Sequence, residues 1–348
     1  DMEQIGIGGY SPLEGFLCKK DFESVIKKMR LNDGTPWTIP IILSITKEEK
    51  EKITLGERIA IVSKIDKEIY GAIEIEDVYT YSKSEFAENV YGTLDLKHPG
   101  VKMLNEYGEY IIGGKIFLKK INNNNQYAHY NMTPKHLRNI FESLGWSKVV
   151  GFHTRNAIHR SHEFIQMDAL KQSGCDGLLI HPVIGLKKKG DFRSEIIIKS
   201  YEIMLKEYYK KNKVIFCTFS SYPRYAGPRE AVFTAICRKN YGCSHFIVGR
   251  DHTGVGNYYD SVASQKIFEK FSDIGMELEF SEEIGYSKQL QRYANVEECE
   301  GEELMKISGT EARKMLNSKV KPPSWFMRPS ISQFIIDMLS EGKKVFVE

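Results

Sequence analysis

Side chains rich in hydrogen-bond donors follow directly on an apolar run near the middle of the chain. The run covers residues 149–152 and is typical of a buried strand. The side chains after it include His153, Thr154, Arg155, Asn156, His159 and His162. His159 and His162 are three residues apart, so they share one face of the helix predicted near 161–172. Such donors, at a strand end before a helix N-terminus, suit an anion the size of phosphate or sulfate.

Histidines are concentrated in this part of the chain. Six of the nine lie between residues 153 and 252, each at or near the end of a predicted strand. They are His153, His159, His162, His181, His245 and His252. A single histidine in such a place is usually a satisfied surface or core residue. The clustering instead favours a functional site at the edge where folds of this kind bind ligands.

A glycine-rich loop follows a second apolar strand, which we predict at 245–248. The loop begins with Gly249, Arg250, Asp251, His252 and Thr253. Glycine lets backbone amides approach an anion closely, so this loop is a second candidate for the same site.

Two further segments have both a functional and a purely structural interpretation. Arg224 and Arg229 lie in a loop before a helix that begins near Pro228, where they either serve the site or pair with surface acids. Ser308 or Thr310 could offer hydroxyl donors to a nucleotide, but capping of a helix over 309–316 would explain both.

Other kinds of site lack their essential parts. The chain has no G-x-x-x-x-G-K-[ST] pattern, so it is not a P-loop kinase or ATPase over these residues. His159 and His162 have no cysteine pair or H-E-x-x-H pattern beside them. We therefore expect no metal site built from protein ligands.

Strands and helices alternate in the part of the chain that carries these motifs. We predict strands at 148–152, 177–184, 214–219 and 245–248, and helices near 161–172, 193–210 and 228–239. This alternation predicts an α/β fold with a parallel sheet, in which ligands bind outside the carboxyl ends of the strands.

The preceding part of the chain predicts a small β-rich domain. Short β-type runs occur at 38–43, 58–62, 70–75 and 110–116, separated by charged turns. The polar tract 121–126 is predicted to be a surface loop, and Thr133 is a candidate N-cap for a helix that begins at Pro134. We therefore expect a β-rich domain over 1–131, a catalytic domain over 132–285 and a small C-terminal subdomain over 286–348.

Composition limits the class of protein. The 348 residues, 41% hydrophobic and 27% charged, are typical of a globular chain with two domains of ordinary size. A net charge of +3 gives no basic field for nucleic acid, so we expect no nucleic-acid partner. The six cysteines show no C-x-x-C spacing, and no apolar run reaches the roughly 20 residues that span a bilayer.

From these features we expect a reducing compartment, the cytoplasm, and no membrane partner. The chain opens at Asp1 rather than at a methionine, so we also expect further residues upstream, among which a plastid transit peptide or a kinase domain would be invisible.

Taken together, the motifs resemble ATP sulfurylase (sulfate adenylyltransferase). The resemblance runs over nearly the whole chain in one order: I-G-G-Y-S-P-L-E-G-F at 7–16, T-R-N at 154–156 with His159 and His162, L-I-H-P at 179–182, R-Y-A-G-P-R-E at 224–230, G-R-D-H at 249–252 and I-S-G-T at 307–310. It implies a PUA-like N-terminal domain, a Rossmann-like nucleotidyltransferase domain and a small C-terminal α/β subdomain. It also implies that sulfate attacks the α-phosphorus of ATP in line, which gives adenosine 5′-phosphosulfate and pyrophosphate.

The resemblance also implies roles for particular residues. His153, Thr154, Arg155 and Asn156 correspond to ATP-binding positions, and His153, Arg155 and Thr253 to sulfate-binding ones. Thr154, Arg155 and Asn156 are implied to be catalytic, with His159 and His162 stabilising charge in the transition state. The adenosine end of ATP is implied to contact Gly249, Arg250, Asp251 and His252, with Ile284 near the base. Magnesium is implied as MgATP, and a homo-oligomer is expected.

One position departs from the family pattern, which begins with glutamine where this chain has His153. A neutral imidazole offers one N–H and a protonated one offers two, so we expect sulfate affinity to weaken as pH rises through the pKa of His153. The cysteine cluster of bacterial relatives is also absent, because Ser287, Lys288 and Gln289 follow Tyr286, so we expect no bound zinc.

Two alternatives stay open at this point. One is another nucleotidyltransferase of the same fold with a different oxyanion substrate. The other is a catalytically silent homologue that binds a nucleotide or RNA.

Overall fold

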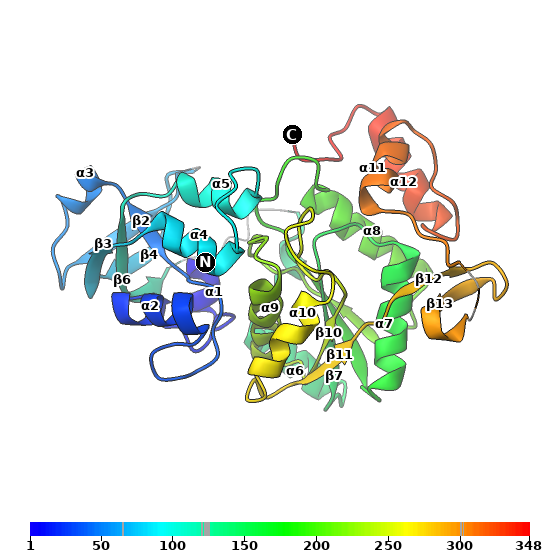
Figure 1. Cartoon of the computed structure of the whole chain (residues 1–348), viewed down its shortest axis with the longest axis horizontal. Coiled ribbons are helices and arrows are strands. Elements are labelled where there is room, and N and C mark those ends of the chain that lie inside the picture. Colours follow the sequence, from blue (N-terminus) through cyan, green and yellow to red (C-terminus); the bar gives the residue numbers. More distant parts are fainter. Residues whose placement is uncertain (65, 120, 122–125, 300, 302) are drawn as a thin grey trace. The chain divides into compact units, whose positions relative to one another are not determined.

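The computed structural model describes residues 1–64, 66–119, 121, 126–299, 301 and 303–348. Its residues group into two compact units, each drawn from separate stretches of the chain (Figure 1). The first unit contains 1–140, 224–242 and 251–276, and the second contains 141–223, 243–250 and 277–348. The polar loop predicted at 121–126 includes 122–125, which lie outside the described residues. The domain boundaries predicted near 131 and 285 remain predictions.

The first unit is built on an antiparallel sheet in the order β1-β6-β4-β3, in which β2 and β5 also pair with β6. Its strands are β1 (Gly15–Phe16), β2 (Leu43–Ile45), β3 (Arg58–Val62), β4 (Ile69–Glu74), β5 (Asp77–Thr80) and β6 (Tyr110–Leu118). Alternate residues of β4 are buried, as expected for a sheet with one face on the core. The predicted β-rich N-terminal part is therefore present.

The strand predicted at 38–43 is wrong. Only Leu43–Ile45 forms a strand there, while Trp37 and Ile41 are completely buried outside any strand. Pro40 has no N–H to donate to a sheet, which disfavours a ladder through this run. The apolar residues were thus correctly assigned to the core but not to a strand.

Most helices of this unit were not predicted, among them α4 (Lys83–Tyr91) and α5 (Pro99–Asn105). Both are short, and their caps hold them. Ser82 Oγ accepts from Glu85 N–H at 3.1 Å, and His98 Nδ1 accepts from first-turn amides of α5. The remaining helical elements of the unit are α1 (Met2–Gly6), α2 (Lys19–Lys28), α3 (Lys47–Lys50), η1 (Ala128–Tyr130), most of α6 (Pro134–Ser143), α9 (Pro228–Asn240), α10 (Ala263–Lys266) and η2 (Ile267–Lys270).

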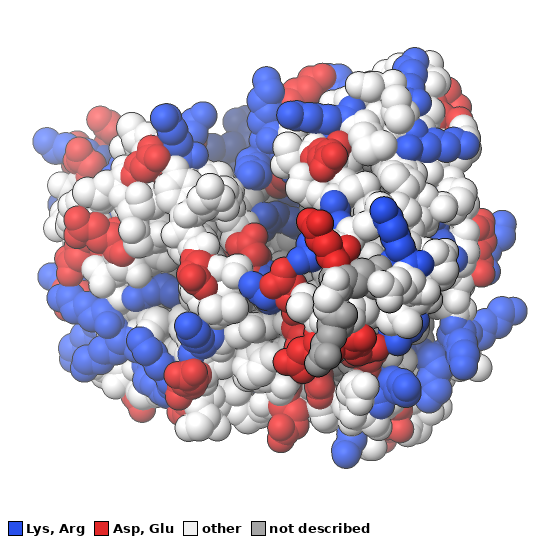
Figure 2. All heavy atoms as spheres, turned by 45° about the vertical axis from the view of Figure 1, so that its right-hand side comes forward, with Lys and Arg blue, Asp and Glu red and all other residues white. Residues whose placement is uncertain are grey.

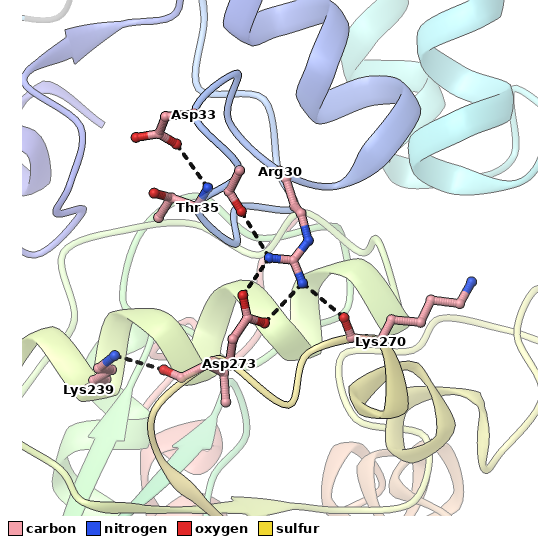
Figure 3. A network of polar contacts seen from close by, with 8 residues as sticks. Arg30, Asp33, Thr35, Lys239, Lys270 and Asp273 are labelled. Atoms are coloured by element: carbon pink, nitrogen blue, oxygen red, sulfur yellow. Dashed lines mark hydrogen bonds and ion pairs between the residues drawn. The ribbon is translucent and has the colours of Figure 1, made fainter.

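Distant parts of the first unit are joined by a polar network around Arg30 (Figure 3). The Arg30 guanidinium makes two hydrogen bonds to the carboxylate of Asp273, at 2.7 and 2.9 Å, and also donates to the carbonyl of Lys270. Lys239, in α9, donates to the carbonyl of Ile274 at 2.7 Å. These bonds hold the segment after η2 in place and need no functional explanation.

The second unit contains a five-stranded sheet in the order β11-β10-β7-β8-β9, and every pairing in it is parallel. Its strands are β7 (Val149–Thr154), β8 (Gly177–Pro182), β9 (Val214–Phe216), β10 (His245–Val248) and β11 (Glu277–Phe280). All residues of β8 and β10 are buried, as expected for central parallel strands. This confirms the predicted parallel sheet.

The strand order of this sheet defines where a ligand should bind. The chain moves outward from β7 through β8 to β9 and then returns to place β10 on the other side of β7. The order therefore reverses between β7 and β10. In open parallel sheets ligands bind outside the carboxyl ends of the strands at such a switch point.

Helices cover the sheet, and a smaller C-terminal part follows. Helix α7 (Arg160–Gln172) contacts β7 and β8 and is drawn in green in Figure 1. Helix α8 (Ser194–Glu207) contacts α12 (Pro329–Ser340), which contacts α11 (Gly309–Asn317). The other elements are the hairpin of β12 (Ile284–Ser287) and β13 (Arg292–Asn295), and η3 (Val296–Glu298).

Two properties of the surface can be stated directly. The face shown in Figure 2 carries Lys and Arg side chains interspersed with Asp and Glu, in keeping with the small net charge of +3. Among the described residues, no helix combines the length and the apolar character needed to cross a membrane.

Candidate functional site

The predicted donors lie where β7 ends. His153 and Thr154 are the last two residues of the strand, and His153 pairs in register with His181 of β8. The Thr154 side chain is buried and its Oγ1 accepts from the backbone N–H of Asn156 at 3.1 Å. This bond fixes the turn that leads from the strand to Arg155 and Asn156, both of which are half-buried.

The strand on the other side of the switch point also ends in predicted site residues. Gly249 and Arg250 follow β10 directly. A Cβ built at Gly249 would meet nothing within 4 Å, so the backbone there borders open space. Arg250 forms an ion pair with Glu283, which also pairs with Lys306. Lys306 is the main cause of the lowered pKa of the Glu283 carboxyl.

The two histidines form a stacked pair at the start of α7. His159 is the N-cap residue and His162 lies in the first turn, and their ring centroids are 3.8 Å apart with the planes at 27°. His159 Nδ1 is 2.7 Å from Ser161 Oγ. His162 packs edge to face on Phe152, and its buried Nδ1 has no hydrogen-bond partner among the described residues.

Burial keeps both imidazoles neutral. It lowers the pKa of His159 to about 4, and it lowers the pKa of His162 well below the usual value, with the neighbouring His159 as the second cause. Two stacked rings at this separation cannot both carry a positive charge cheaply. At neutral pH the pair therefore presents neutral N–H donors beside the first-turn amides of a helix.

The lowered pKa makes the protein less stable in mild acid. An unfolded histidine titrates near 6.5, so between about pH 6.5 and 4 the unfolded chain binds a proton that His159 in the folded protein does not. The folded protein is therefore not penalised above pH 6.5, and it becomes progressively less stable as the pH falls toward 4. We expect the free energy of unfolding at pH 5.5 to be lower than at pH 7.5 by about 1 kcal/mol from His159.

Urea unfolding of the wild type and of His159→Gln at the two pH values measures this effect. The variant cannot titrate at this position, so its pH dependence should be smaller by that amount. An identical pH dependence in the two proteins would contradict the assignment.

Cations that the sequence reasoning did not single out lie near Arg155. Lys188 follows β8, and burial lowers its pKa, with Arg155 and Arg313 as further causes and Asp191 acting in the opposite sense. The positive charges of Arg155 and Arg313 thus both act on Lys188, and the buried carboxylate of Asp191 partly offsets them. Such a cluster attracts anions. The run of three lysines at 187–189 was a signal that could have been used.

The loop after Arg250 enters the first unit. There His252 Nε2 is 3.0 Å from Thr234 Oγ1, and the buried Thr253 hydroxyl donates to the carbonyl of Gly227 at 2.8 Å. Asp251 is exposed and has a positive φ of 53°. The ligand contacts expected for Asp251, His252 and Thr253 remain predictions.

The arginine-containing loop before α9 is structural. Arg224 forms an ion pair with Asp1, and the buried Glu230 carboxylate accepts from the Arg224 backbone N–H at 2.8 Å. Arg229 donates to the carbonyls of Val25 and Ile26, and burial lowers its pKa to about 10. Both arginines therefore hold contacts within the first unit, and their partners are the largely buried Asp1 and two backbone carbonyls rather than the surface acids of the structural interpretation.

A cavity of about 220 Å³ lies beside α7 in the second unit, and of the predicted site residues only Ile284 lines it. Its lining includes the apolar Phe164 and Ile247 and the carboxylates of Asp168 and Glu279.

Ser308 is the N-cap of α11, since its Oγ accepts from Glu311 N–H at 3.1 Å, which confirms the predicted cap.

Over the described ranges, no group of three His, Cys, Asp or Glu side chains could hold a metal ion. The expectation that the protein binds no zinc stays a prediction.

Two family models match this chain. Residues 128–338 match the model described as ATP-sulfurylase, and residues 1–120 match the model of a PUA-like domain. The sulfate adenylyltransferase of Pyrococcus abyssi is 44% identical over 338 residues, which cover 96% of this chain and 87% of the relative. That of Thermococcus onnurineus is 43% identical over 351 residues, covering 100% and 89%.

A solved structure shares the fold. The hexameric APS kinase from Thiobacillus denitrificans matches 95% of this chain with a TM-score of 0.75 and 21% sequence identity. This chain spans 59% of that protein's chain. At such an identity the likeness shows the fold alone.

Proposed function

This chain belongs to the ATP-sulfurylase family, and from that premise we propose that residues at the end of β7 and the start of α7 join sulfate to the adenylyl group of ATP. The protein is a sulfate adenylyltransferase, a nucleotidyltransferase that converts ATP and sulfate into adenosine 5′-phosphosulfate and pyrophosphate. We propose that one site serves both directions of the reaction, since the forward and reverse steps pass through the same transition state.

The chemistry needs donors rather than a base. Sulfate is a dianion at neutral pH and pyrophosphate in MgATP is a competent leaving group, so no proton has to move in the central step. The site must instead hold two anions together and stabilise the charge that develops as sulfate attacks the α-phosphorus in line. We propose that Arg155 binds sulfate and that Thr154 and Asn156 contact the phosphates.

The observation that carries this proposal is the stacked histidine pair. Its two neutral rings stand at the first turn of α7, directly after the strand beside the switch point. Neutral imidazoles can donate to phosphoryl oxygens as negative charge develops on them in the transition state, without the cost of burying two cations. We propose that His159 and His162 stabilise the transition state in this way.

Other family roles are retained as proposals. Gly249, Arg250, Asp251 and His252 would contact the adenosine end of ATP, and Thr253 would lie near sulfate. Ile284 lines an apolar wall of the cavity beside α7, which supports a contact with the base. Magnesium would enter as MgATP. A homo-oligomer and a cytoplasmic location also remain proposals.

His153 should make sulfate binding depend on pH. If its imidazole contacts sulfate, the protonated form offers two donors and a positive charge, and the neutral form offers one donor. We expect the KM for sulfate to rise between pH 5.5 and 8.5 in the wild type and to rise less in His153→Gln. Initial rates across this range measure the KM for sulfate. A KM that does not change with pH and is the same in both proteins would contradict a contact between His153 and sulfate.

The test of the proposed function is pyrophosphate release from MgATP with sulfate, selenate or molybdate as the acceptor. Sulfate should give turnover, and selenate should replace it as a tetrahedral dianion of similar shape. Release only with a carboxylate or phosphate ester would assign the site to a different nucleotidyltransferase, and no release with any acceptor would favour a catalytically silent homologue.

A further inference from the structure

We propose that Phe326 and Ser161 are positioning residues that hold His159 as a neutral imidazole with its proton on Nε2. This inference rests on the proposed function, because it names the groups that prepare one of its two histidines. Neither residue was singled out by the motifs of the sequence.

The ring of Phe326 stacks on His159. Their centroids are 5.1 Å apart and the planes differ by only 17°, while His162 stacks on His159 with the centroids 3.8 Å apart. An aromatic face on His159 excludes water from that side of the imidazole. Exclusion of water disfavours the imidazolium, which is the direction of the pKa shift at His159.

Ser161 decides which nitrogen carries the proton. Its Oγ is 2.7 Å from His159 Nδ1, and either atom could be the donor. If Nδ1 donated, Nε2 would present a lone pair, which would repel a phosphoryl oxygen. If the serine hydroxyl donates, Nε2 carries the N–H and can donate to an anion. Only the second arrangement fits a site for ATP and sulfate.

The segment that carries Phe326 is fixed to the start of α7 by other bonds. The carbonyl of Phe326 accepts from the Arg160 N–H at 2.8 Å, which satisfies an amide of the first turn. Arg328 makes two hydrogen bonds to the carboxylate of Glu163 and lies 4.2 Å from the centroid of the Tyr208 ring. These bonds therefore hold the Phe326 ring in place against His159.

Two arginines and one carboxylate lie around this turn, and their net positive charge is not among the causes of the lowered pKa of His159. Arg160 lies on α7 and Arg328 comes from the C-terminal segment, and both pair with Glu163. His159 also contacts His162 and Ser161 at the start of its own helix and Phe326 of the C-terminal segment. None of these three adds a charge, so stacking and the serine hydroxyl remain as the controls on the state of His159.

The test uses Ser161→Ala, Ser161→Thr and Phe326→Leu. Nitrogen-15 NMR of labelled histidine in the ligand-free protein reports which nitrogen of His159 carries the proton, independently of any activity. We expect Nε2–H in the wild type and in Ser161→Thr, and a mixture of tautomers in Ser161→Ala. In Phe326→Leu the pKa of His159 should rise toward 6.5.

Kinetics give the second readout. We expect kcat to fall by about tenfold to a hundredfold in Ser161→Ala and Phe326→Leu, with the KM for MgATP within about threefold of the wild type. Ser161→Thr should recover most of kcat. The control for a general loss of packing is Phe192→Leu, since Phe192 is buried in the same unit and its ring packs against that of Phe346 with the centroids 4.9 Å apart. Its kcat should be that of the wild type.

Three results would overturn the inference: Nδ1–H in the wild type, an unchanged tautomer and kcat in Ser161→Ala, or an equal loss of kcat in Phe192→Leu and Phe326→Leu. Absence of sulfate-dependent turnover in the wild type would instead reject the proposed function. The NMR readout would still decide the state of His159 in that case.

Discussion

Replacing either histidine of the stacked pair should nearly abolish the reaction while leaving the fold intact. We expect His159→Ala and His162→Ala each to lower the sulfate-dependent rate by about 10²–10³, the usual effect of losing one donor to a transition state. Both rings stand at the first turn of α7, so their removal leaves the sheet and its strand order untouched. The rates of pyrophosphate release and the melting temperatures measure the two effects separately.

The matched control is His136→Ala, which removes an exposed histidine from α6. Its rate should equal that of the wild type. A near-normal rate in both His159→Ala and His162→Ala would contradict the roles assigned to the pair. Because the two rings are in contact, their effects should not be additive, and the double variant should be little slower than the slower single one.

Arg155 should be as important as the histidines and should not be replaceable by lysine. We expect Arg155→Ala to lower the sulfate-dependent rate by at least about 10² and Arg155→Lys to recover only a small part of it. A guanidinium offers a planar fork that can hold two oxygens of one anion, whereas an ammonium is a point charge. Steady-state rates at saturating MgATP and varied sulfate measure the loss.

Arg193→Ala is the control for this position. It removes an exposed arginine of the same unit, whose side chain pairs with Glu195 at 3.4 Å. The control should leave kcat and both KM values unchanged. A wild-type rate in Arg155→Lys would show that only a positive charge is needed there, and that the bidentate contact with sulfate does not form.

The parts of the site that depend on short-range spacing could be predicted from the sequence. His159 and His162 are three residues apart, and an apolar run precedes them, so a shared helix face after a strand follows directly. The cap at Ser308 also depends on neighbouring residues alone. For the same reason most strands and helices of the second unit lie within a few residues of their predicted bounds.

The parts that depend on distant residues could not be predicted. Nothing local says that β10 pairs with the far side of β7, and this pairing is what creates the switch point. Phe326 reaches His159 from the C-terminal segment, more than 160 residues further along the chain. The strand predicted at 38–43 failed because burial alone does not distinguish a strand from a buried loop.

Local patterns also left the role of the arginines open. Arg224 and Arg229 have the residue type of an anion site, and only the structure shows that one pairs with Asp1 and the other with backbone carbonyls. In contrast, Lys188 was not singled out from the sequence, but it is half-buried and its pKa is influenced by Arg155 and Arg313. Tertiary contacts thus give a structural role to residues that suit an anion site, and they bring a residue that was not singled out close to the site.

The central claim is that this site transfers an adenylyl group between pyrophosphate and sulfate. It is tested most directly by exchange of labelled pyrophosphate into ATP by the wild-type protein, with and without sulfate. The account predicts exchange that requires both magnesium and sulfate and that disappears in His159→Ala. Exchange that is independent of sulfate, or no exchange in a fully folded protein that binds MgATP, would contradict it.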